Sequence, residues 1–203
     1  MEESLVQRLG ADRLRRAVRE RYDAVADDPA GSYGFRVGRQ FAEALGYPPE
    51  LLDRLPTSSV ERFTGVATPV YGAVLQPGEH VLDLGCGAGV DTIVAAEAVG
   101  PAGRVIALDF AEAMVRRTHM SVAALGLEHV AVCQGDAEAL PLATGSIDCV
   151  LVNGLFNLAP DKSQVMTETA RVLRPGGRLV AAETVITRPL DAGELTSLDD
   201  WFR

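Results

Sequence analysis

The chain has 203 residues, of which 47% are hydrophobic and 23% are charged, a composition that fits one or two globular domains and excludes a disordered chain. Nineteen basic residues against 28 acidic ones give a net charge of −9, so we expect neither a nucleic-acid-binding surface nor attraction to anionic membranes. No apolar run approaches the roughly 18 residues of a membrane span, and the first residues lack the order of a signal peptide, so we expect a cytoplasmic protein.

Three cysteines occur in the chain, Cys86, Cys133 and Cys149. Their odd number and their spacing match neither a disulfide framework nor a zinc site, so we expect no bound metal and a reducing compartment. Of the basic residues, only Lys162 is a lysine. Together with the abundant alanine and glycine, this excess of arginine indicates a GC-rich bacterial genome.

The first part of the sequence predicts helices. Apolar residues recur at helical spacing over residues 11–27, in a stripe formed by Leu14, Val18, Tyr22 and Val25. Five arginines lie on the other faces of this helix among acidic residues. We interpret them as a solvated mixed-charge surface rather than as a nucleic-acid site.

Two shorter helices are expected at residues 37–45 and 49–54, where the second is preceded by prolines, and residues 55–67 are expected to form a loop. The character of the sequence changes near residue 75. We therefore predict an N-terminal helical cap or extension over residues 1–74 and a second domain over residues 75–203.

Beyond residue 75, short apolar runs alternate with amphipathic segments. Strands are predicted at residues 80–84, 104–108, 129–133, 148–152 and 178–185. Helices are predicted at residues 90–99, 111–125 and 161–174, the last with a stripe of Met166, Ala170 and Leu173, and a further helix starts near Asp191. This alternation predicts an α/β fold, a Rossmann-like doubly wound parallel sheet with helices on both faces.

The most informative run is VLDLGCGAG at residues 81–89, where the first strand turns into the first helix of the sheet domain. Gly85, Gly87 and Gly89 allow a tight turn and let a ligand approach the backbone closely. Their spacing is G-x-G-x-G, whereas a dinucleotide fingerprint is G-x-G-x-x-G. Asp83 precedes the loop, and its carboxylate would repel a diphosphate but attract an ammonium or sulfonium group.

Polar residues also follow the next three strands. Asp109 can accept hydrogen bonds from both hydroxyls of a ribose, and it can also cap the helix that follows. Asp136 can accept from an adenine amino group while the Ala137 N–H donates to the ring. Asn153 follows the fourth strand. Acidic residues at successive strand ends indicate a nucleoside ligand that carries a positive charge and no phosphate.

These features resemble class I S-adenosylmethionine (SAM) dependent methyltransferases. The matching pieces are VLDLGCGAG at 81–89, VIALD at 105–109, GDAEALP at 135–141, DCVLVN at 148–153 and RVLRPGGRLV at 171–180. The resemblance implies SAM as cofactor and a SAM-binding domain over residues 75–203. It places the cofactor contacts at Asp83, Gly85, Gly87, Asp109, Phe110, Asp136, Ala137 and Asn153, with Gly89 completing the loop.

A closer resemblance, to the arsenite methyltransferase branch, rests on GYPPELL at 46–52, FTGVATP at 63–69 and the long run from Val152 to Leu179. That family binds trivalent arsenic through cysteine thiolates, one of them directly after the asparagine of the fourth strand. Here Gly154 holds that position, and residues 1–85 contain no cysteine. Because arsenic requires soft ligands, arsenite remains only one of the possible substrates.

The resemblance also implies the strand order 3-2-1-4-5. Class I methyltransferases usually add two more strands, and we expect these sixth and seventh strands to be absent, because the sequence ends at Arg203. The fifth strand would then be an exposed edge. We expect that the chain is a fragment, forms a homodimer over this edge or has lost activity, or else that residues 186–203 cover the edge.

The leading hypothesis is therefore methyl transfer from SAM to a small-molecule acceptor, with no catalytic residue identified. The alternative is a catalytically impaired SAM-binding or interaction protein derived from a methyltransferase. A dinucleotide-dependent oxidoreductase is disfavoured by the glycine spacing and by Asp83.

Overall fold

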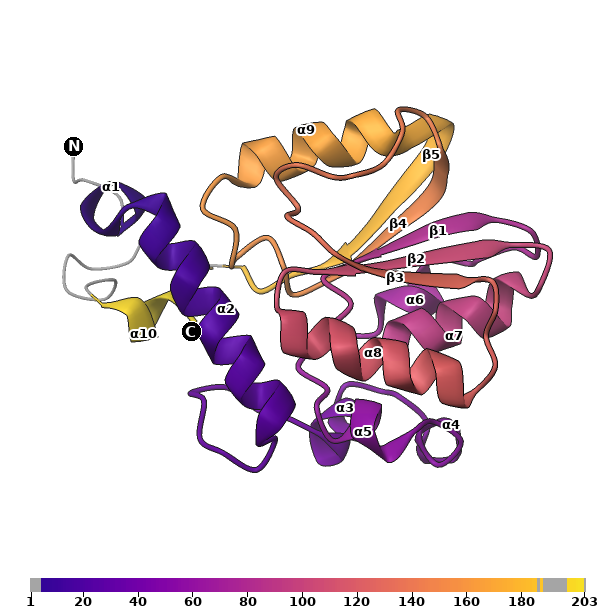
Figure 1. Cartoon of the computed structure of the whole chain (residues 1–203), viewed down its shortest axis with the longest axis horizontal. Coiled ribbons are helices and arrows are strands. Elements are labelled where there is room, and N and C mark those ends of the chain that lie inside the picture. The colour runs from indigo at the N-terminus through magenta and orange to yellow at the C-terminus, as the bar shows by residue number, and fades with distance from the viewer. Residues whose placement is uncertain (1–4, 186, 188–196, 203) are drawn as a thin grey trace.

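The computed structural model describes residues 5–185, 187 and 197–202. Short and long helices come first: α1 (Leu5–Leu9), α2 (Ala11–Asp27), α3 (Arg39–Ala44), α4 (Pro49–Leu52), α5 (Thr57–Val60) and α6 (Pro69–Gly72). Strands then alternate with helices: β1 (His80–Leu84), α7 (Val90–Val99), β2 (Arg104–Asp109), α8 (Glu112–Ala124), β3 (Val130–Gln134), β4 (Ile147–Asn153), α9 (Lys162–Val172) and β5 (Leu173–Ala182). The last described helix is α10 (Leu198–Trp201) (Figure 1).

The strands form one parallel sheet in the order β3-β2-β1-β4-β5, which confirms the predicted fold class and strand order. The central strand is β1, where Val81 lies opposite Val105 of β2 and Cys149 of β4. The chain therefore leaves β1 in one direction toward β2 and returns on the other side in β4. The switch point of the sheet therefore lies between β1 and β4, and ligands of open α/β folds bind at this point.

The two faces of the sheet are both covered, as the continuous apolar strands predict. Successive residues of a strand point to opposite faces, so Val81 packs in a core with Ile93 of α7. The next residue, Leu82, packs on the other face in a core with Val165 and Val172 of α9. Figure 1 shows α7 and α8 on one side of the sheet and α9 on the other.

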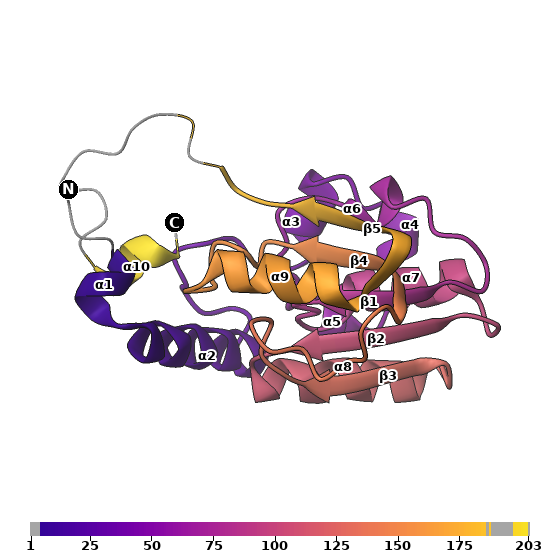
Figure 2. The ribbon, with the colours of Figure 1, turned by 90° about the horizontal axis from the view of Figure 1, so that it is seen from above.

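The N-terminal helices pack directly on the sheet region. Val25 of α2 shares a small core with Ala113 and Met114 of α8. The backbone N–H of Ala113, in the first turn of α8, donates to Asp23 Oδ1 of α2 at 2.9 Å, so one helix satisfies an unpaired N–H at the start of another. In Figure 2 the strands point toward the side of the molecule on which α2 lies, which places α2 near the carboxyl ends of the sheet.

Several element boundaries differ from the predicted ones. The segment expected as a loop over residues 55–67 contains the short helix α5. The fifth strand begins at Leu173, because the Arg-Pro-Gly-Gly segment after α9 continues the strand. The buried stripe of α9 is Val165, Thr169 and Val172, one position before the predicted stripe.

The helix expected to start near Asp191 falls partly on residues 191–196, outside the described residues, and α10 follows them. Within the described part of the chain, no helix has both the length and the apolar character that crossing a membrane requires.

Candidate functional site

Two adjoining cavities open at the carboxyl end of the sheet. The larger has an empty volume of about 760 Å³ and the smaller one of about 350 Å³, and both volumes include space open to solvent. Gly85, Gly87 and Asn153 line both. The larger cavity also contains Asp109, Phe110, Asp136 and Ala137, and the smaller contains Asp83. Eight of the nine residues predicted as cofactor contacts thus line one or both of these cavities.

The glycine loop bends around the start of α7. Gly87 has a φ of +52°, and a Cβ atom added there would meet nothing within 4 Å, so the bare backbone faces open space at the wall of both cavities. Gly89, the ninth predicted contact, has a different role. It lines neither cavity, and a Cβ atom there would lie 2.9 Å from Thr118 Cγ2 of α8. Gly89 therefore allows the close approach of α7 to α8.

Asp109, the last residue of β2, fixes the loop. Its Oδ2 accepts a hydrogen bond from the Gly87 N–H and its Oδ1 accepts one from the Ala111 N–H, both at 2.8 Å. Burial raises the pKa of Asp109, although these N–H groups act in the opposite direction. The N-cap residue of α8 is Ala111, so the Asp109 side chain orders the turn before the helix rather than capping it. Phe110 lines the same cavity. The guanidinium carbon of Arg19 lies 4.4 Å from the centroid of the Phe110 ring.

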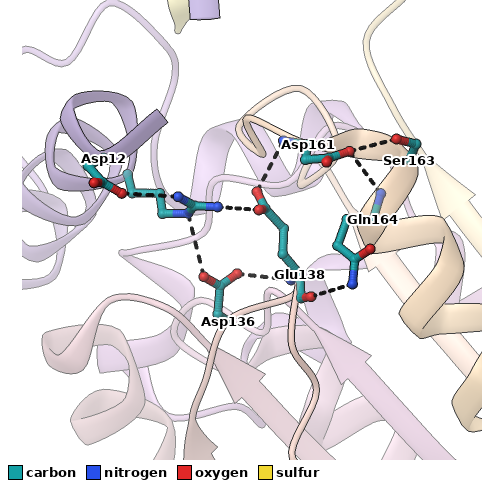
Figure 3. Close-up of polar contacts among 7 residues, drawn as sticks. Asp12, Asp136, Glu138, Asp161, Ser163 and Gln164 are labelled. Atoms are coloured by element: carbon teal, nitrogen blue, oxygen red, sulfur yellow. Dashed lines mark hydrogen bonds and ion pairs between the residues drawn. The ribbon is translucent and has the colours of Figure 1, made fainter. Parts of the chain in front are cut away.

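A cluster of charged side chains, Arg15, Asp136 and Glu138, lines the larger cavity, and Figure 3 shows its polar contacts. Asp136 Oδ1 accepts from the Glu138 N–H at 2.9 Å, and Asp136 Oδ2 lies 3.6 Å from Nε of Arg15. Arg15 also pairs with the buried carboxylate of Glu138, whose other oxygen accepts from the Asp161 N–H at 3.1 Å. These contacts join α2, the loop after β3 and the start of α9 around the cavity.

Arg15 and Arg19 were missed at the sequence level, where all five arginines of this helix were interpreted as solvated. That interpretation was wrong for Arg15, which is half-buried and lines the larger cavity, whereas Arg19 is exposed, as predicted. The available signal was their spacing, because Arg15, Arg19 and Tyr22 stand at i, i+4 and i+7 and so share one face of α2. Arg15 and Tyr22 line the larger cavity, and Arg19 covers Phe110 at its edge.

Buried carboxyl groups characterise the smaller cavity. Asp83 is 2% exposed and accepts from Thr92 Oγ1 at 2.5 Å, and Asp91 accepts from the Tyr47 hydroxyl at 2.5 Å. Burial and the neighbouring charge of Asp91 raise the pKa of Asp83 to about 8. Burial also raises the pKa of Asp91. Arg62 is 8% exposed and lines the same cavity. It donates hydrogen bonds to the backbone carbonyls of Ala26 and Ser58.

Asn153 joins the end of β4 to the segment before α6. Its Oδ1 accepts from the N–H groups of Val66 and Ala67 at 2.7 and 3.2 Å. Its Nδ2 donates to Ala67 O at 2.9 Å and to Asp91 Oδ2 at 2.8 Å. Both the oxygen and the nitrogen of the Asn153 amide therefore make hydrogen bonds within the chain. These bonds hold Asn153 in a fixed position in the cavity wall.

Part of the wall of the larger cavity is apolar. It is formed by Val18, Leu155, Leu158, Ala159 and Pro160. The described residues that line the larger cavity include no cysteine. Cys86 and Cys149 are buried and Cys133 is half-buried, and all three are free thiols.

Comparison with known proteins gives consistent matches. A family described as "Methyltransferase domain" matches residues 75–202. The arsenite methyltransferase of Halobacterium salinarum is 35% identical over 201 residues, which cover 92% of this chain and 51% of that protein. A demethylmenaquinone methyltransferase of Bacillus cytotoxicus is 42% identical over 111 residues, 54% of this chain and 46% of that protein.

Among solved structures, an arsenic(III) S-adenosylmethionine methyltransferase from Chlamydomonas reinhardtii is 35% identical with a TM-score of 0.59, and the match covers 66% of this chain and 48% of that one. The chain spans about half the length of these relatives.

Proposed function

The chain belongs to the class I SAM-dependent methyltransferases, and we propose that it transfers the methyl group of SAM to a small organic acceptor. The observation that carries this proposal is the wall of the larger cavity. There the bare backbone of Gly87 stands beside the carboxyl groups of Asp109 and Asp136. A cationic nucleoside fits such a wall, whereas a diphosphate would be repelled by it.

We assign the parts of SAM to the two cavities by their chemistry. Asp109 would accept hydrogen bonds from the ribose hydroxyls, and Asp136 and Ala137 would bind the adenine beside Phe110. The smaller cavity would take the amino-acid part, because Asp83 suits its ammonium group and Arg62 its carboxylate. SAM supplies an activated methyl group when bound, so the chain's main task is to orient the acceptor and exclude water.

The acceptor would enter between α2 and the loop after β4. A Cβ atom at Gly154, where the related arsenite enzymes are expected to carry a thiol, would lie 3.3 Å from Val66 Cγ1. This position therefore offers no soft ligand for arsenic. Arsenite is the second candidate acceptor, favoured by the 35% identity to the Halobacterium salinarum enzyme.

We further propose that residues 1–74 form the cover and residues 75–203 the cofactor domain of a cytoplasmic protein. β5 is an edge strand of the described sheet, and homodimerisation over it is part of the proposal. Light scattering on the full chain tests this, since a monomer mass would contradict it.

Transfer of a labelled methyl group tests the activity directly. The full chain is incubated with methyl-labelled SAM and a panel of phenols, enols, thiols, amines and arsenite. We expect transfer to at least one organic acceptor and none to arsenite. Arsenite methylation alone would support the second candidate. SAM binding without transfer to any acceptor would support the impaired SAM-binding protein instead.

The substitution Gly87→Ala is expected to weaken SAM binding by at least about tenfold, because its methyl group projects into the space assigned to the cofactor. An alanine at positive φ costs stability on the order of 1 kcal/mol. Gly126→Ala is the matched control, since Gly126 has a φ of +64° and also faces open space, away from both cavities. Calorimetric titration with SAM compares them, and equal affinities in the two variants would contradict the assigned position of the loop.

A further inference from the structure

Glu183 directly follows β5 and contacts the loop after β4, whose residue Leu155 lines the larger cavity, although Glu183 is not itself among the lining residues. Its neighbour Ala182 lies opposite Asn153 in the sheet, and the Gly154 N–H donates to Ala182 O at 2.9 Å. Asn153 and Gly154 both line the cavity. The backbone of β5 therefore fixes Glu183 beside the loop that forms the acceptor wall.

The two oxygens of this carboxyl group have different surroundings. Oε1 accepts from the N–H groups of Leu155 and Phe156, both at 2.9 Å, so it holds the start of the loop after β4. Oε2 is buried and has no hydrogen-bond partner in the described part of the chain. A buried acceptor without a partner is costly, which points to a donor that arrives with a ligand.

Two titratable side chains from other elements face Glu183. Tyr22 of α2 lines the cavity, and burial together with the charges of Asp109 and Glu183 raises the pKa of Tyr22. Lys162 of α9 donates to Phe156 O at 2.8 Å. Burial lowers the pKa of Lys162, and the charge of Glu183 opposes this effect. Lys162 is thus engaged by the loop, while the Tyr22 hydroxyl has no hydrogen-bond partner among the described residues.

An acceptor that suits this end of the cavity needs an apolar body and one hydroxyl donor. The apolar body would pack on Leu155, Leu158 and Val18, which line the cavity. The hydroxyl would donate to Glu183 Oε2, with Tyr22 beside it. These features together describe a phenol- or enol-type compound.

We propose that Glu183 is the general base of the reaction and that the acceptor is a phenol- or enol-type hydroxyl compound; this inference rests on the proposed methyl transfer. The acceptor oxygen attacks the methyl carbon, the S–CH₃ bond breaks as the O–CH₃ bond forms, and S-adenosylhomocysteine leaves as a neutral thioether. The hydroxyl proton passes to Glu183 Oε2 and from there to solvent, so charge and atoms balance.

The variant Glu183→Gln separates this role from a purely structural one. Its amide oxygen can still accept from Leu155 and Phe156, but it cannot take a proton. We expect the methylation rate of phenols to fall by about 100-fold or more, the scale of general-base catalysis. For thiols that are already ionised at the assay pH, the fall should stay within about threefold, because no proton has to be removed.

The pH profile provides a second readout, since the rise of kcat/KM with pH at its acidic limb should be lost for phenols in Glu183→Gln. Equal losses for phenols and thiolates would mean that Glu183 only holds the loop, and unchanged phenol methylation would exclude it as a base. Either result overturns the inference while leaving methyl transfer itself intact.

A binding measurement keeps the inference testable even if no acceptor is methylated. The full chain loaded with S-adenosylhomocysteine is titrated with 4-methylphenol, which keeps its hydroxyl proton at neutral pH, and with toluene, which lacks the hydroxyl. We expect the wild type to bind the phenol at least about tenfold more tightly, as a hydrogen bond to a charged group allows, and Glu183→Gln to lose this preference. Equal binding of both compounds by the wild type would contradict the inference.

Discussion

Replacing Asp109 with alanine is expected to weaken SAM binding by about 10- to 100-fold, the range for losing hydrogen bonds to a charged group. The carboxyl group would bind the ribose, and it also holds the Gly87 N–H and the Ala111 N–H at 2.8 Å. Its removal therefore both deletes a ligand contact and loosens the loop. Calorimetric titration of the folded variant with SAM measures the effect.

Asp28→Ala is the matched control for Asp109→Ala. Asp28 also accepts from a backbone N–H, that of Ala30 at 3.2 Å, but it is exposed and lies outside both cavities. We expect this control to bind SAM as the wild type does. If Asp109→Ala also kept wild-type affinity, Asp109 would have no part in the cofactor site.

Replacing Asp83 with asparagine is expected to stabilise the protein at alkaline pH while it weakens cofactor binding. Burial raises the pKa of Asp83 to about 8, well above the value of about 4 in an unfolded chain. Between these two values the native state binds more protons than the unfolded state, so the wild type loses stability as the pH rises. Asparagine removes this dependence.

Urea unfolding at pH 5 and pH 8 measures the effect. The stability of Asp83→Asn relative to the wild type should grow by at least about 1.4 kcal/mol between the two pH values, the equivalent of one pKa unit. The exposed Glu128→Gln serves as a control with no such change. A constant difference between Asp83→Asn and the wild type would show that Asp83 is already ionised in the native protein.

The same variant tests the assigned role of the smaller cavity. A bound cation favours the ionised form of Asp83, so the ratio of wild-type to Asp83→Asn affinity for SAM should rise between pH 6.5 and 8.5. Using the ratio removes the titration of the ligand's own amino group. A ratio that stays constant would place the ammonium and sulfonium groups away from Asp83.

The parts of the fold that could be predicted have a strong local pattern. The stripe from Leu14 to Val25 predicted α2 over the residues that the structure assigns to it, and the apolar runs predicted the strands within a few residues. The errors fall where the local pattern is ambiguous. In α9, Val165, Thr169 and Val172 have the same spacing as the predicted stripe, and only packing against the sheet distinguishes the two sets.

The candidate site was predictable only where residues follow strand ends. Asp109, Asp136 and Asn153 come together because parallel strands end at one edge of the sheet. Arg15 and Glu183 reach the site from α2 and from the end of β5, and their contacts with Glu138 and with the loop after β4 depend on tertiary packing. Helical spacing places Arg15 on the same face of α2 as Tyr22, but it does not reveal which residues Arg15 and Glu183 contact.

The proposed function depends on a cavity beside the glycine loop that binds a cationic nucleoside and not a diphosphate. Calorimetric titration of the unmodified chain with SAM and with NAD tests this preference. We expect one SAM bound per chain and an affinity for NAD at least about 100-fold weaker, because the carboxyl groups of the cavity repel a diphosphate. Binding of NAD as tight as that of SAM, or heat of binding from NAD alone, would contradict this preference.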